Sequence, residues 1–208
     1  MRYASGMPLR RLPAGDGVLI QIVDAALADA SRRSGEWLVC HLGCTQCCVG
    51  VFAINQLDAV RLQQGLADLE IADPRRAHRV RERARASVEH LSADFPGDTS
   101  TGVLDVGQEA EERFAEFAND EPCPALDPKT GLCDLYEARP MTCRTFGPPV
   151  RSGDGLGVCE LCFNGASDEE IAACEMVVDP DDLESKLLAK LEQTNGPRGQ
   201  TVVAFCLK

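Results

Sequence analysis

Aromatic residues are scarce in this chain of 208 residues, which contains seven Phe, two Tyr and one Trp. A hydrophobic core with so few rings must be built mainly from Leu, Val, Ala and Ile. Histidine is rarer still, with only His41, His78 and His90. No Ser–His–Asp triad and no paired-carboxylate arrangement can be argued from these residues, so it stays open whether the protein is an enzyme.

Long hydrophobic runs are absent as well. No segment approaches the roughly 20 apolar residues that a membrane-spanning helix needs. The apolar stretch near the N-terminus is interrupted by Pro13, Asp16 and Asp24, which makes a poor signal-peptide core. We therefore expect a cytoplasmic protein that does not enter a membrane. Structural disulfides are rare in the reducing cytosol, so an odd total of eleven cysteines favours bound metal over cysteine pairing.

Basic residues are outnumbered, 21 to 33, and the formal net charge of −12 argues against duplex DNA as a partner. One segment departs from this balance, because PRRAHRVRERARA (74–86) holds six arginines. Small or apolar residues recur through it at helical spacing, from Ala77 to Leu91. The segment is either a helix with one buried stripe and a solvated arginine face, or a docking surface for an acidic protein partner or RNA.

Helical patterns dominate the remaining sequence, and we expect a mainly α fold with at most short β segments. A flexible tail over 1–17 precedes a single metal-binding domain over 18–208. Capping signals predict helix starts at Asn55, Asp73-Pro74, Ser167 with Glu170, and Asp179-Pro180. The predicted helices cover about 18–33, from 55 onward, 74–93, 105–118, from 167 onward and 180–193, and 95–102 is predicted as a loop. Residues 119–165 lack helical periodicity, so something other than a helical face must order them.

Nine cysteines gather in two blocks, 40–50 and 123–162, and these are the residues that we expect to bind metal. Metal ligands come as short chelating pairs joined by contributions from distant loops. Turn-forming residues from Asp127 to Gly131 predict a reversal that returns Cys133 close to Cys123. The predicted ligands are Cys40, Cys44, Cys47, Cys48, Cys123, Cys133, Cys143, Cys159 and Cys162.

The sequence leaves the kind of metal open, because a thiolate ligand set suits both zinc and an iron–sulfur cluster. Cys47 and Cys48 are adjacent, and side chains of neighbouring residues are expected to diverge. They therefore bind different metal atoms, which favours a cluster, or one of them only packs. Disulfides and a redox-active Cys159–Cys162 pair are weaker alternatives. Cys174 and Cys206 are expected to be small buried residues, and His41 is either a ligand or an exposed side chain.

GCTQCC (43–48) and CPALDPKTGLCDLYEARPMTCRTFG (123–147) together resemble the YkgJ family of cysteine-cluster proteins, whose CxxCxxCC domain chelates zinc or iron. The first block departs from that family's pattern, with three residues rather than two between Cys40 and Cys44. The second block matches at the residues of the C-P-x-L, G-x-C-x-x-Y and R-P-x-x-C-R motifs: Cys123, Pro124, Leu126, Gly131, Cys133, Tyr136, Arg139, Pro140, Cys143 and Arg144.

The resemblance implies a metal-binding protein with a role in redox chemistry, metal handling or protein modification. Iron–sulfur-dependent lysine N-methyltransferases are similar to the family, so that activity is one alternative. A structural zinc domain that presents the basic helix to a partner is another. Within the motifs, Tyr136 and Phe146 are expected to cover the site. Arg139 and Arg144 either offset the thiolate charge, which we favour, or pair with carboxylates of the helices.

Overall fold

The structure, a computed structural model, describes residues 10–41, 43–152, 155–194 and 196–208. Its described strands form only two-stranded antiparallel pairs, so the predicted mainly α class is confirmed. The helices are α1 (Asp16–Ser34), α2 (Gln56–Ala72), α3 (Pro74–Leu91), α4 (Gln108–Ala115), α5 (Met141–Thr145), α6 (Asp168–Ala173), α7 (Leu183–Glu192) and α8 (Val203–Leu207). The strand pairs are β1 (Ala53–Ile54) with β8 (Thr201–Val202), β2 (Gly97–Asp98) with β3 (Val103–Leu104), β4 (Leu126–Asp127) with β5 (Leu132–Cys133), and β6 (Val150–Ser152) with β7 (Gly155–Gly157).

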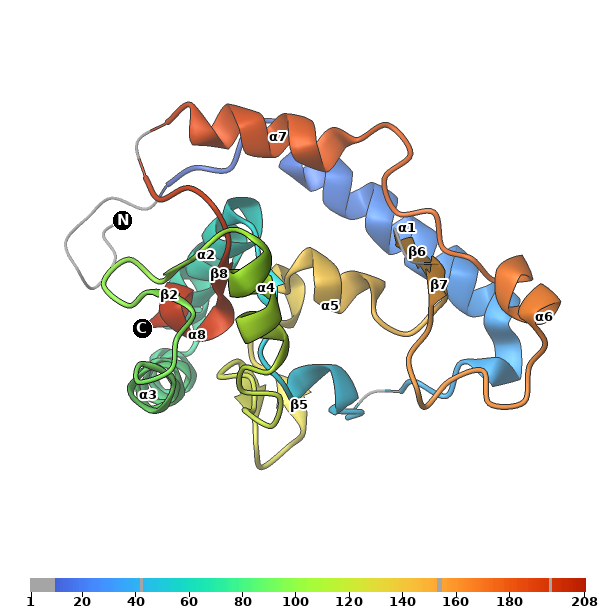
Figure 1. The fold of residues 1–208 in the computed structure, drawn as a ribbon, viewed down its shortest axis with the longest axis horizontal. Helices are drawn as coiled ribbons and strands as arrows, with labels where there is room; N and C mark the ends of the chain where they lie inside the picture. The colour runs from blue at the N-terminus through green and yellow to red at the C-terminus, as the bar shows by residue number, and fades with distance from the viewer. Residues whose placement is uncertain (1–9, 42, 153–154, 195) are drawn as a thin grey trace.

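The helices form two groups, with α5 between them (Figure 1). In one group α2, α3 and α8 pack against one another, and in the other α7 lies along α1. The groups are joined because α7 also contacts α2, while α5 contacts α1. The β4–β5 hairpin, which carries part of the second cysteine block, lies below α5 in the view of Figure 1.

The core of the α2–α3–α8 group is aliphatic, as the scarcity of aromatic residues predicts. The face of α3 that bears Ala77, Val80 and Ala84 packs in one cluster with Leu62 and Leu66 of α2. This confirms the buried stripe predicted for the basic helix. Each leucine removed from water in this way contributes about 1.5–3 kcal/mol of hydrophobic stabilisation.

A separate aromatic cluster fixes the C-terminus to the β2–β3 hairpin. The ring of Phe95 stacks on that of Phe205 with centroids 4.2 Å apart, and Phe117 meets Phe95 edge-on at 5.9 Å. Phe205 belongs to α8, all of which is buried. The sequence predicted no element there, because five residues are too few to show a helical period.

Helix starts predicted from capping residues are confirmed at three places. The Asn55 side chain accepts a hydrogen bond from the Asp58 N–H (3.1 Å) at the start of α2. Asp73 caps α3 in the same way. Ser167 and Glu170 form the predicted reciprocal capping box at the start of α6.

The start predicted at Asp179-Pro180 is wrong, because α7 begins only at Leu183. Asp182 adopts a left-handed conformation (φ 51°), through which an α-helix cannot continue. Asp179 still helps the helix to start, since its carboxylate accepts from the Glu184 N–H (2.7 Å). The aspartate is thus a distant cap rather than the residue next to the first turn.

Two further predicted boundaries need correction. The acidic helix expected at 105–118 is only α4, and it begins after Gly107, whose φ of 109° lies outside the helical region. The loop expected at 95–102 contains β2, because Gly97 and Asp98 pair with β3.

The tail predicted over 1–17 falls largely on residues 1–9, which lie outside the described residues. From its described end, Arg10 donates to the carbonyl oxygen of Leu191 (2.9 Å). α1 then begins at Asp16, two residues earlier than predicted. No helix in the described ranges is both long and apolar enough to cross a bilayer.

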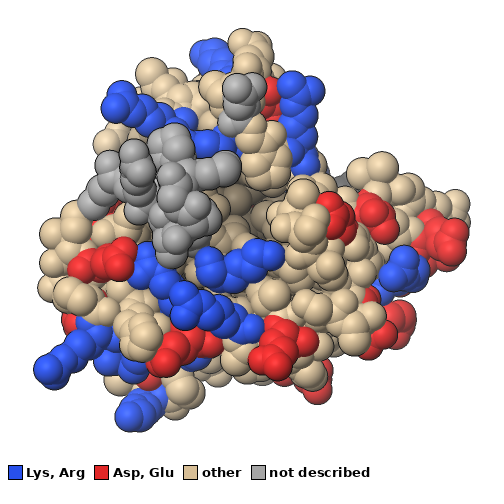
Figure 2. Space-filling model, turned by 90° about the vertical axis from the view of Figure 1, so that its left-hand side faces the viewer, with Lys and Arg blue, Asp and Glu red and all other residues tan. Residues whose placement is uncertain are grey.

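The basic helix α3 is less free than its composition suggests. Arg76 and Arg83 both pair with the buried carboxylate of Asp134, and Arg81 pairs with Glu70 at 2.8 Å. The face shown in Figure 2, which is the α3 side of Figure 1, mixes Lys and Arg with Asp and Glu. The prediction of a solvated arginine face therefore holds only for part of α3.

Candidate metal centre

The first cysteine block is folded into two tight turns. The Cys44 N–H donates to the carbonyl oxygen of His41 (2.9 Å), and the Cys48 N–H donates to that of Thr45 (2.8 Å). The second turn is a 3-10 helix, η2 (Gln46–Cys48), in which the sulfurs of Cys47 and Cys48 lie only 4.0 Å apart. The expectation that these neighbouring side chains diverge is wrong, because the tight turn places both sulfurs on the same side of the backbone.

Backbone hydrogen bonds attach the first block directly to the second. The Cys123 N–H donates to the carbonyl oxygen of Cys48 (2.8 Å), and the Gly50 N–H donates to that of Glu121 (2.9 Å). These bonds form between segments that are about 70 residues apart in the sequence. They bring Cys47, Cys48 and Cys123 to the same place.

The reversal predicted between Cys123 and Cys133 is confirmed. The Gly131 N–H donates to the carbonyl oxygen of Asp127 (2.9 Å), and Gly131 has a φ of 70°, which glycine adopts without strain. The resulting β4–β5 hairpin pairs Leu126 with Cys133. Cys133 thereby returns to the neighbourhood of Cys123.

Cys143 reaches the same region from α5, a helix of five residues that is held from both sides. The Met141 N–H donates to the Asp58 carboxylate of α2 (3.0 Å). The Arg144 guanidinium binds Asp24 of α1 at 2.7 and 3.0 Å. Arg144 is only 1% exposed, whereas the Asp24 side chain is 45% exposed, so the pair joins a buried guanidinium to a carboxylate at the surface.

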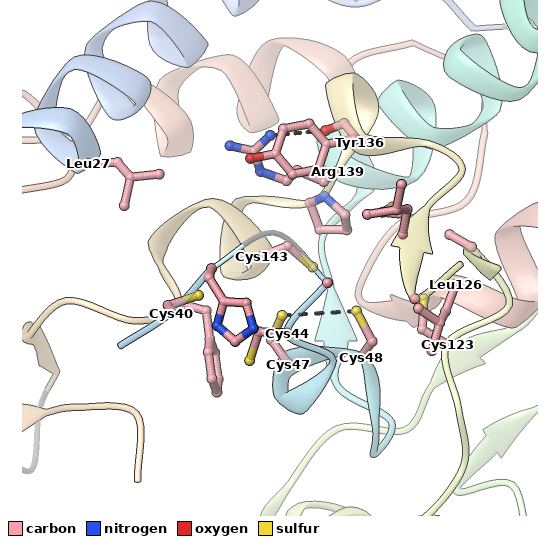
Figure 3. Close-up of a pocket in the computed structure, with 18 of the residues that line it drawn as sticks. Leu27, Cys40, Cys44, Cys47, Cys48, Cys123, Leu126, Tyr136, Arg139 and Cys143 are labelled. Atoms are coloured by element: carbon pink, nitrogen blue, oxygen red, sulfur yellow. Dashed lines mark hydrogen bonds between the residues drawn. The ribbon is translucent and has the colours of Figure 1, made fainter. Parts of the chain in front are cut away.

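Seven of the nine predicted ligands line one cavity of about 360 Å³. They are Cys40, Cys44, Cys47, Cys48, Cys123, Cys133 and Cys143. In the view of Figure 3, Cys40 lies on one side of the Cys47–Cys48 pair and Cys123 lies on the other. Side chains that sequence reasoning missed complete the wall, among them Leu27 and Ser31 of α1. No local signal marks these two, because they lie in an ordinary helical pattern.

Cys159 and Cys162 are placed elsewhere. They are buried in a small apolar cluster with Phe163 and Cys174, and Trp37 packs against this cluster. The Cys162 N–H donates to the carbonyl oxygen of Cys159 (2.8 Å), so the pair forms a tight turn of its own. Cys174 is buried, as predicted, and so is Cys206 in the α2–α3–α8 core.

The thiols of the cavity differ in acidity. The hydrogen bond between the two sulfurs lowers the pKa of Cys47 to about 6 and raises the pKa of Cys48. Burial raises the pKa of Cys123 to about 12 and also raises the pKa values of Cys133 and Cys143. The negative charge of Cys47 raises all three further, so Cys47 is the thiol whose charge reaches each of them.

The pKa of Cys40 responds to cysteines of the cavity and also to Cys159 and Cys162. Burial raises the pKa of Cys40 to about 11, and the nearby thiolates of Cys44, Cys47, Cys162 and Cys159 raise it further. Burial also raises the pKa of Cys159, with additional effects from Cys162 and Cys44. The side chain of Gln46, between Cys44 and Cys47, hydrogen-bonds to Glu160, so the Cys159–Cys162 turn lies beside the first cysteine block.

Both motif arginines pair with Asp24 of α1, Arg144 at 2.7 Å and Arg139 at 3.6 Å. The preference for charge compensation is wrong for Arg144, which does not line the cavity. Arg139 lines the cavity, where its charge is one of the smaller causes that lower the pKa of Cys47. It also lies 4.0 Å from the centre of the Tyr136 ring, and Tyr136 and Phe146 form exposed parts of the cavity wall. His41 is exposed at the same wall, with Nδ1 3.1 Å from the Val39 carbonyl oxygen.

Comparison with known proteins agrees with this geometry. Residues 39–154, more than half of the chain, match the CxxCxxCC family, described as "Putative zinc- or iron-chelating domain". The chain belongs to the CxxCxxCC family. No curated protein and no solved structure gives a significant match. All seven cysteines of the cavity lie inside the CxxCxxCC match, whereas Cys159 and Cys162 follow it.

The donor set fits the metals that the CxxCxxCC description names, since soft thiolates bind zinc and the irons of iron–sulfur clusters. Within the part of the chain that the structure describes, no three His, Cys, Asp or Glu side chains already meet closely enough to share one metal ion. The sulfurs stand around the cavity wall instead. Rotation about χ1 moves a cysteine sulfur without moving the backbone.

Proposed function

We propose that the protein holds an iron–sulfur cluster in this cavity and takes part in electron transfer. The observation that carries the proposal is the volume of the cavity that the thiols line. A single zinc ion draws four sulfurs to about 2.3 Å from one point and leaves no cavity between them. A space of about 360 Å³ is more than twice the roughly 150 Å³ of an apolar protein cavity that takes up benzene. An iron–sulfur cluster, which contains several iron and sulfide atoms, suits a cavity of this size better than a single zinc ion does.

Four thiols are the best candidates for the ligands: Cys47, Cys123, Cys133 and Cys143. Four cysteines complete the usual ligand set of a [4Fe–4S] cluster. They come from η2, from the β4–β5 hairpin and the residues leading into it, and from α5, and hydrogen bonds among protein groups hold these segments in place. The proposed ligands thus converge from three segments onto one cavity.

The remaining residues of the cavity would tune the cluster rather than bind it. When bound, an iron–sulfur cluster accepts and releases single electrons at a potential that its surroundings set. Cys48 is placed to donate its S–H to the sulfur of Cys47, at a separation of 4.0 Å. Arg139 contributes positive charge at the same wall. Both effects favour the more negative, reduced state.

The alternatives receive less support from the fold. A methyltransferase would need a site for its methyl donor, and the sequence offers only the glycine-rich stretch near 153–159. Its described part forms the β6–β7 hairpin rather than a turn from a strand into a helix. A zinc domain that presents the basic helix is disfavoured because Arg76 and Arg83 bind Asp134.

The test is anaerobic purification followed by quantitation of iron and acid-labile sulfide, with visible and electron paramagnetic resonance spectra before and after reduction. We expect about four irons and four sulfides per chain and a spectrum that bleaches on reduction. A colourless protein without sulfide would contradict the proposal. A cluster that reduction and reoxidation cannot cycle would contradict the electron-transfer role alone.

A further inference from the structure

The Cys159–Cys162 turn faces the first cysteine block through direct contacts outside the cavity. The Phe163 N–H donates to the carbonyl oxygen of Trp37 (2.9 Å), which fixes the turn to the segment leading into Cys40. Gln46, between Cys44 and Cys47, hydrogen-bonds through its side-chain amide to the carboxylate of Glu160. The central residues of two Cys-x2-Cys turns therefore touch, and their flanking cysteines belong to neighbouring loops.

The environment of this second group differs from that of the cavity. Cys159 and Cys162 are only 8% and 4% exposed and pack with Phe163 and Cys174. Trp37 and Leu38 pack against the same cluster, so apolar side chains surround the two thiols. A zinc ion with four thiolates has its sulfurs about 2.3 Å from one point and needs no cavity between them.

We propose that Cys40, Cys44, Cys159 and Cys162 bind one zinc ion in a tetrathiolate site separate from the iron–sulfur centre. The spacing supports this assignment, since structural zinc sites join two short Cys-x2–4-Cys pairs from different loops. Cys40 and Cys44 are separated by three residues and Cys159 and Cys162 by two. Cys159 and Cys162 lie outside the CxxCxxCC match, so the match alone does not specify the site.

The zinc ion would cross-link two loops that are far apart in the sequence. It would fix the loop after α1 to the loop before α6, which otherwise share the Phe163–Trp37 bond and the Gln46–Glu160 contact. Binding replaces the protons of the four thiols, so zinc uptake should release protons into solution. The site rests on the proposed function only in that Cys47, Cys123, Cys133 and Cys143 are assigned to the other centre.

The test compares metal contents of the whole chain and its variants after anaerobic expression with both zinc and iron supplied. We expect about one zinc per chain beside the iron in the wild type. The C159S/C162S variant should lose zinc at least fivefold and keep its iron, sulfide and visible spectrum. C174S is the matched control, because Cys174 lies in the same apolar cluster, and it should keep both metals. C40S should also lower the zinc content. Because Cys40 is exposed, a loss of zinc in C40S cannot be attributed to disruption of the buried apolar cluster.

The outcomes separate the two proposals. Zinc X-ray absorption should show four sulfur neighbours at about 2.3 Å, and a shell dominated by nitrogen or oxygen would overturn the site. Unchanged zinc in C159S/C162S, or parallel loss of iron and sulfide, would overturn it as well. A protein that holds no iron but loses zinc in C159S/C162S would refute the cluster and support the zinc site.

Discussion

Arg83 Nη2 of α3 lies 2.6 Å from Asp134 Oδ2, the carboxylate of the residue that follows Cys133. Arg83 Nε also donates to the carbonyl oxygen of Pro124 (2.8 Å), the residue that follows Cys123. One arginine thereby holds both ends of the hairpin that presents two of the proposed ligands. The side chain of Asp134 is only 1% exposed, so its charge depends on Arg83 and Arg76.

We predict that D134N destabilises the protein by about 2 kcal/mol, because it leaves arginine donors without their buried partner. The variant should also lose iron faster when challenged with a chelator, since the hairpin is less firmly held. Chemical denaturation and the rate of iron release measure the two effects. R85Q, an exposed arginine on the same helix, is the control and should stay within about 0.5 kcal/mol of the wild type.

Adjacent cysteines provide a closely matched pair of variants. We predict that C47S loses most of its iron and sulfide, whereas C48S and C48A keep them, because only Cys47 is proposed as a ligand. C48A removes the S–H donor to the Cys47 sulfur, and this should lower the reduction potential of the centre. Metal analysis and potentiometric titration give the two readouts. Retention of iron in C47S with its loss in C48S would reverse the assignment.

Removal of metal should loosen one part of the chain selectively. We predict that chelation under denaturant-free conditions makes residues 119–152 sensitive to protease, while fragments spanning α2 and α3 persist. The reason is that α2, α3 and α8 share an aliphatic core, whereas the second block is organised by turns and short strands. Structural metal sites contribute energies comparable to the whole stability of a domain. Mass spectrometry of timed digests identifies the cuts, and uniform cleavage along the chain would contradict the prediction.

We predict no tight binding to duplex DNA, because the net charge is −12 and charges of both signs mix on the α3 side of the molecule (Figure 2). Fluorescence anisotropy at physiological salt should give no binding at micromolar protein. Sub-micromolar affinity that disappears when the exposed Arg75, Arg79 and Arg85 are neutralised would show that the local helix outweighs the total charge.

Local chemistry explains what the sequence could predict. The caps at Asn55 and Asp73 act within three residues of themselves, and the turn before Cys133 is specified by Asp127 and Gly131. Such features can be found from the sequence because the interacting groups are neighbours in it. The grouping of cysteines into blocks likewise followed from their spacing.

Contacts between distant residues explain what the sequence could not predict. The Arg144–Asp24 pair joins residues 120 positions apart, and no local pattern distinguishes Asp24 from the other acids of α1. The separation of Cys159 and Cys162 from the cavity depends on the enclosure formed by Trp37 and Phe163. The approach of the Cys47 and Cys48 sulfurs depends on the local 3-10 turn, which cysteine spacing alone does not specify.

The bond from the Met141 N–H to Asp58 spans 83 residues, and this separation has a consequence for how the protein is made. A ribosome that adds about 5–20 residues per second needs roughly 4–17 s to travel from one partner to the other. Through that interval the first cysteine block is already synthesised while Cys143 is not. The nascent chain therefore carries accessible thiols before the proposed centre can be complete, and insertion of the proposed cluster would have to follow translation of α5.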